Sequence, residues 1–124
     1  MTPAAPSAAG GKERERGHSM SEFSEIHVTC ASKEEAARIG RTAVEKWLAA
    51  CAQVSGPITS VYRWKEEVRE DEEWLLTLKT RACLFDEVSA LVAAEHSYEV
   101  PQITAVPLDD LSPSYEEWLA AQIR

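Results

Sequence analysis

The side chains best suited to chemistry lie in two short segments that are far apart in the sequence. Cys30 ends the run EIHVTC, and His96 lies in EHSYEVPQI between the carboxylates of Glu95 and Glu99. A thiolate, an imidazole and a carboxylate are donors suited to copper or zinc. Together they predict an incomplete metal site that water or a neighbouring subunit would complete.

Each of these residues also has a purely structural interpretation. A histidine at the C-terminal end of a helix is favoured by the helix dipole and can bond the last carbonyls, so that Tyr98 and Pro101 only shape the turn. Cys30 is either a small buried residue or a thiolate favoured by the dipole of a following helix. Because the spacing is not a tight ligand motif, both interpretations stay open.

Hydrophobic periodicity predicts the elements that position these residues. Ser32 is expected to cap a helix, with Glu35 completing a capping box, and the acidic stretch 65–73 is expected to turn the chain. In chain order, the predicted elements are a strand at 25–30, a helix from 32 to about 50, strands at 52–64 and 74–80, a helix at 82–95, a strand at 102–108 and a helix that begins at 113.

This order predicts a mixed α/β (α+β) fold of the ferredoxin-like, split βαβ kind, β-α-β-β-α-β, with an added C-terminal helix. Right-handed crossovers give the strand order 4-1-3-2, with neighbours antiparallel. At ~3.3 Å per residue the 52–64 strand would be ~40 Å long, so its hairpin would project beyond the sheet. The topology then brings Cys30, the 95–99 junction and Trp64 to one end of the sheet.

A projecting, partly apolar hairpin leaves long strand edges unpaired, which isolated proteins avoid. We therefore expect an oligomer; the alternative is a monomer whose terminal helix and acidic charges cover the edge. Tyr62, Trp64, Lys79, Arg81 and Tyr98 are candidates to line a cleft between subunits for a small anionic ligand. Alternatively, these side chains pack against a neighbouring subunit.

The composition limits the class of protein. The chain has 124 residues, enough for one domain, and a net charge of −8, of which residues 21–124 carry −9. An acidic body repels nucleic acid phosphates, and no apolar run approaches the ~20 residues that span a bilayer. Residues 1–20 lack an apolar signal-peptide core and are predicted to be a disordered tail or a cloning remnant. We expect a single domain at 21–124, in the cytoplasm, that binds neither nucleic acid nor membrane.

Catalytic motifs are missing from the sequence. It contains no P-loop, no GxSxG elbow and no HExxH. Cys30, Cys51 and Cys83 include no CxxC pair, so neither a zinc knuckle nor a redox dithiol is supported. We therefore expect a binding protein rather than an enzyme.

Six segments together resemble the CutA divalent-cation tolerance family over about residues 25–122. They are VTCASKEEA, VEKWLAAC, ITSVYRWKEEV, EEWLLTLKT, EHSYEVPQI and PSYEEWL. The resemblance implies a ferredoxin-like homotrimer whose long hairpins pair between subunits, linked to tolerance of copper and other divalent cations, with Cu(II) bound by some members. It also implies that metal is bound by the cysteine ending the first strand, here Cys30, and by a histidine pair, of which the second matches His96. Glu95 stands in place of the first histidine.

Two further departures from the family pattern have structural consequences. Ser97 stands where the family usually has proline, which is expected to loosen the turn. Glu66 stands where the hairpin usually has glycine, so the turn forms differently or strains a residue.

The expected function is a Cu(II)-binding trimer in divalent-ion tolerance, with no catalysis. The alternative is a PII-like trimeric regulatory or scaffold protein that binds a small ligand or a protein partner in intersubunit clefts, an analogy of fold only.

Overall fold

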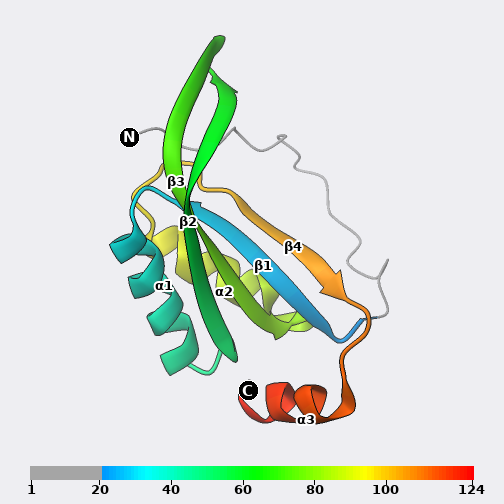
Figure 1. The fold of residues 1–124 in the computed structure, drawn as a ribbon. Helices are drawn as coiled ribbons and strands as arrows, with labels where there is room; N and C mark the ends of the chain where they lie inside the picture. The colour runs from blue at the N-terminus through cyan, green and yellow to red at the C-terminus, as the bar shows by residue number, and fades with distance from the viewer. Residues whose placement is uncertain (1–20) are drawn as a thin grey trace.

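Four strands form one antiparallel sheet in the order β2-β3-β1-β4 (Figure 1). This is the predicted order 4-1-3-2, so the predicted fold is confirmed. The computed structural model describes residues 21–124; the tail predicted at 1–20 lies outside them. The elements are β1 (Phe23–Cys30), α1 (Lys33–Glu45), β2 (Cys51–Trp64), β3 (Glu67–Arg81), a 3₁₀ turn (Ala82–Leu84), α2 (Phe85–Glu95), β4 (Ile103–Leu108) and α3 (Pro113–Ala121). No helix in the described part of the chain is long and apolar enough to cross a membrane.

Helices α1 and α2 pack on one face of the sheet and leave the other face uncovered along most of its length (Figure 1). In β1, Ile26 and Val28 are buried against these helices. The residues between them point to the opposite face, because side chains alternate along a strand. Gly40 allows α1 to approach the sheet closely, since a Cβ there would lie 2.7 Å from the Cβ of Ala52.

Helix α1 ends five residues earlier than predicted. Trp47 adopts a left-handed φ of 61°, the N–H of Trp47 donates to the carbonyl of Val44, and the N–H of Leu48 donates to that of Ala43. These two hydrogen bonds form a Schellman motif at the helix C-terminus, and glycine usually occupies the left-handed position that Trp47 holds here. Because a tryptophan occupies it, the sequence carries no glycine stop signal there.

The acidic stretch is a strand, which corrects its assignment as a turn. β3 begins at Glu67 and pairs with β2 as far as Trp64, so that only Lys65 and Glu66 connect the strands. Both have positive φ, 52° and 70°, as a two-residue type I′ turn requires. Of the two alternatives left open for this turn, a different form or a strained residue, the structure has the second, because Glu66 holds a left-handed φ. Charge does not prevent a strand here because the hairpin projects beyond the helices and exposes its side chains to water.

Helix α3 covers the sheet at the end opposite the hairpin (Figure 1). Its Leu119, together with Ile123, packs on Phe23 and Ala50 in a second small cluster. The helix begins at Pro113, as predicted, after Ser112. Its Tyr115 and Trp118 remain exposed, with ring centroids 5.6 Å apart.

Candidate functional site

His96 lies at the junction between α2 and β4, and both of its ring nitrogens are engaged. Its Nε2 is 2.9 Å from the carbonyl oxygen of Thr29, and its Nδ1 is 3.0 Å from the backbone nitrogen of Tyr98. A carbonyl only accepts and an amide N–H only donates, so Nε2 carries the proton and Nδ1 accepts. The ring is fully buried and ties the junction to the end of β1.

Glu35 holds the same junction from the side of α1. The Ser32 hydroxyl accepts the Glu35 N–H at 3.1 Å, which confirms the predicted cap. The Glu35 carboxylate, however, accepts from the N–H of Ala31 instead of completing the box on Ser32, and it also accepts from Ser97. Both the N–H and the hydroxyl of Ser97 donate to it, at 2.6 and 3.1 Å. The expectation that Ser97 loosens the turn is therefore wrong, because a proline has no N–H to donate.

Cys30 is fully buried at the end of β1. Burial, followed by the negative charges of Glu35 and Glu73, raises the pKa of its thiol from 9.0 to about 12. Of the two interpretations left open for Cys30, the structure supports the small buried residue, because desolvation and two nearby carboxylates favour the thiol over the thiolate. At neutral pH Cys30 is a protonated thiol.

The two predicted carboxylates differ in their surroundings. Glu95 accepts from the Arg38 guanidinium at 2.6 Å, and its backbone carbonyl accepts from the same guanidinium at 3.2 Å. Glu99 is exposed. Within residues 21–124, no three side chains of His, Cys, Asp or Glu gather in a group that could hold a metal ion.

Cys30, His96, Glu95 and Glu99 lie at one end of the sheet, as the topology predicts, but within residues 21–124 they are not gathered as a preformed cation site. A metal bound there would have to displace the proton of the Cys30 thiol and the hydrogen bond that Nδ1 of His96 accepts. The metal site stays a prediction. The structure gives the same residues a clear structural role, which is to fasten the α2–β4 junction to β1 and α1.

A buried tyrosine–carboxylate pair extends this network to the base of the hairpin. The Tyr98 hydroxyl donates to Glu73 at 2.7 Å, and both side chains are buried. Burial, and then this hydrogen bond, raises the pKa of Tyr98 far above its ordinary value. Neither Glu35 nor Glu73 was predicted from the sequence to be part of the candidate site. The position of Glu35 in the first turn of the helix indicates only a capping role, and Glu73 cannot be told apart from the other acidic residues of the 65–73 stretch.

The residues predicted to line a cleft are dispersed within one chain. Tyr62 and Trp64 lie in the hairpin, where the Tyr62 hydroxyl donates to Asp71. Lys79 lies further along β3, where its Nζ donates to Gln53 Oε1 at 2.9 Å. Arg81 forms an ion pair with Glu22. Tyr98 is buried in the junction. These residues do not form one site in a single copy, and their role between copies stays a prediction.

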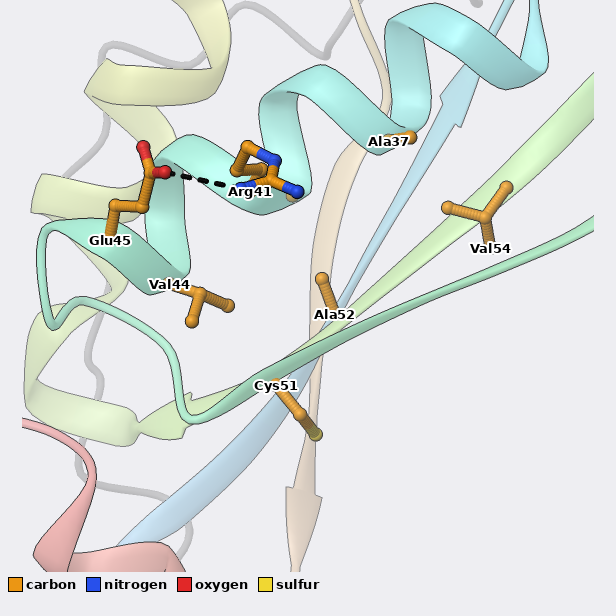
Figure 2. A pocket seen from close by; sticks show the side chains of 8 residues that line it. Ala37, Arg41, Val44, Glu45, Cys51, Ala52 and Val54 are labelled. Carbon is orange, nitrogen blue, oxygen red and sulfur yellow. Dashed lines mark hydrogen bonds and ion pairs between the residues drawn. The ribbon is translucent and has the colours of Figure 1, made fainter.

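A hollow of about 470 Å³ lies elsewhere, between α1 and the outer edge of β2 (Figure 2). Its α1 wall carries the exposed Arg41–Glu45 ion pair. Its β2 wall is formed by Cys51, Ala52 and Val54. The hollow is therefore mostly apolar, and it borders a strand edge that has no partner among residues 21–124.

Comparison with known proteins decides the family. Residues 24–122 match the family described as CutA1 divalent ion tolerance protein. The chain belongs to this family. A relative from Thermus thermophilus, named divalent-cation tolerance protein CutA, is 41% identical over 94 residues, which are 76% of this chain and 91% of that protein. Mouse protein CutA is 36% identical over 117 residues, 94% of this chain.

Solved structures agree with the CutA1 assignment. The divalent cation tolerance protein from Thermus thermophilus has a TM-score of 0.79 at 37% identity, covering 82% of this chain and 99% of that one. CutA1 from Oryza sativa has a TM-score of 0.80 at 36% identity, and the match covers 86% of this chain and 98% of that one. The chain spans 64% of the length of the mouse and human CutA proteins.

Proposed function

We propose that this CutA1 chain serves divalent-cation tolerance as a homotrimer that binds a divalent cation, with Cu(II) as the leading candidate, and that it does so in the cytoplasm without catalysis. The family assignment supports the tolerance role. Assembly is supported above all by the sheet, which within residues 21–124 has an uncovered face and two unpaired edge strands.

The uncovered face and the hairpin offer apolar surface for assembly. On the hairpin, Val61 is 63% exposed and Val68 is 65% exposed. On β4, Val106 is also exposed. Large exposed apolar side chains on edge strands are characteristic of surfaces that another chain covers.

The two edges favour a closed ring of copies. β2 and β4 are the outer strands of the same sheet, and the hollow beside α1 gives access to the β2 edge. If β2 of one copy pairs with β4 of the next, every copy uses both edges. Such a head-to-tail contact leaves no edge open when the ring closes.

Cys30, His96, Glu95 and Glu99 stay the predicted ligands of the cation. Binding there must displace the Tyr98 N–H from Nδ1 of His96 and the proton from the Cys30 thiol. Cation binding at the predicted site therefore costs free energy that binding at an open site would not, and its affinity is expected to be modest. The affinity is expected to rise with pH because binding releases protons.

Light scattering coupled to size exclusion, followed by calorimetric titration with Cu(II), tests the proposal. The expected mass is three times the 13.7 kDa of one chain, and the titration is expected to show saturable binding. A protein that remains monomeric at micromolar concentration would contradict the assembly. A trimer that takes up no divalent cation would contradict the binding role.

A further inference from the structure

Helix α3 carries an aromatic patch that stays exposed within residues 21–124. Tyr115 and Trp118 are three residues apart and so lie on one side of the helix, with ring centroids 5.6 Å apart; they are 37% and 44% exposed. Trp47 is 54% exposed and lies past the far end of α3, where its carbonyl accepts the N–H of Arg124. We call these three rings the α3 patch. Exposed aromatic rings gathered in this way mark a surface that binds a partner.

The ring of copies proposed above does not use the α3 patch. That ring joins β2 of one copy to β4 of the next, and α3 belongs to neither strand edge. Two patches meeting face to face would bring like charges together. Four exposed carboxylates lie in the first half of α3 and in the loop before it, namely Asp109, Asp110, Glu116 and Glu117. The occupant expected here is therefore an apolar segment with positive charge beside it.

Residues 1–20 contain a sequence of this kind. They begin with MTPAAP, in which Pro3 and Pro6 form a PxxP motif, and continue to KERER at 12–16, so that their net charge is +1 against −9 for residues 21–124. PxxP segments bind aromatic-lined surfaces as a polyproline II helix, which loses little entropy on binding. Because that helix has three residues per turn, its two prolines face the same side. The sequence therefore offers an apolar side to the α3 patch and positive charges to the carboxylates beside it.

The attachment point brings this segment within reach of the patch. The Ser21 hydroxyl donates to Asp109, in the loop that joins β4 to α3, so residues 1–20 join the described chain beside the start of α3. At ~3.3 Å per residue, residues 7–20 can span ~45 Å, whereas the nine residues of α3 extend over only ~14 Å. A segment tethered in this way has an effective concentration on the order of millimolar, so that even a weak contact is populated.

We propose that Pro3 and Pro6 dock on the α3 patch of the same chain, with the basic residues of 12–16 beside the carboxylates at the start of α3. The docked segment covers the exposed rings and leaves both strand edges free. This contact requires neither a cation nor the ring of copies, so its test is independent of the proposed function.

The indole N–H signals of the full chain, recorded by nuclear magnetic resonance, test this contact. The parent is compared with a variant that combines Pro3→Ala and Pro6→Ala, and Trp118→Phe identifies the signal of the α3 patch. The Trp118 signal is expected to shift between the parent and the proline variant. Trp64 and Trp74 are internal controls whose signals are expected to stay in place, because they lie toward the hairpin end of β2 and β3.

The matched control combines Ala8→Ser and Ala9→Ser, two changes outside the PxxP motif, and is expected to keep the parent's Trp118 signal. A peptide of residues 1–11, added to the proline variant at millimolar concentration, is expected to restore that signal. A Trp118 signal that is the same in the parent and the proline variant would overturn the proposal, as would an equal shift in the control. A shift that disappears on dilution, while the mass of the assembly stays constant, would also overturn it, because the contact would then join separate assemblies.

Discussion

Replacing His96 with alanine tests whether this residue is a structural fastener. The substitution removes the donor to the Thr29 carbonyl and the acceptor of the Tyr98 N–H, both within a ring that is fully buried. Each buried group left without its partner costs roughly 1–3 kcal/mol, so the two together predict a loss of about 2–6 kcal/mol in the free energy of unfolding. At about 4 °C per kcal/mol for a domain of this size, Tm should fall by roughly 8–24 °C.

Thermal and urea unfolding followed by circular dichroism, at one fixed protein concentration, would measure this change. Concentration must be matched because assembly raises the apparent stability. Glu99→Ala is the matched control: this exposed neighbour is expected to change the stability by no more than about 0.5 kcal/mol. If His96→Ala were as stable as the parent, the two hydrogen bonds would not hold the junction, and the ring would be available to a ligand.

Three other substitutions test the packing, the hairpin and the buried thiol. Gly40→Ala should destabilise by about 1–3 kcal/mol, because its Cβ would lie 2.7 Å from the Ala52 Cβ; an unchanged urea midpoint would show that α1 can move away. Glu66→Gly should stabilise by about 1 kcal/mol, since glycine adopts φ of 70° without strain; a lower Tm would contradict this. Burial raises the pKa of the Cys30 thiol from 9.0 to about 12. The folded protein therefore keeps a proton that the unfolded chain releases, and stability should fall as pH rises from 9 toward 12. Cys30→Ala should show a smaller fall, and an equal fall in both proteins would assign the effect to other groups.

The sheet and its strand order could be predicted from the sequence because they depend on local patterns. Alternating apolar residues mark β1, and the spacing of the following helix and hairpin leaves few allowed topologies. The end of α1 could not be predicted in the same way. It depends on Trp47 adopting a left-handed conformation, closed by two backbone hydrogen bonds, at a position where the sequence has no glycine.

The candidate site could be predicted in position but not in chemistry. Topology alone placed Cys30 near the junction that contains His96. The state of each side chain depends on long-range contacts, namely the Thr29 carbonyl on one ring nitrogen and the burial around the thiol. Such partners leave no mark on the local sequence. For the same reason Ser97, which was expected to loosen the turn, fastens it through Glu35.

Native mass spectrometry of the full chain with added Cu(II) tests the central claim most directly, because one spectrum reports both the number of copies and the number of bound cations. The account predicts a trimer that carries bound copper. A monomer, or a trimer with the same mass with and without copper, would contradict it.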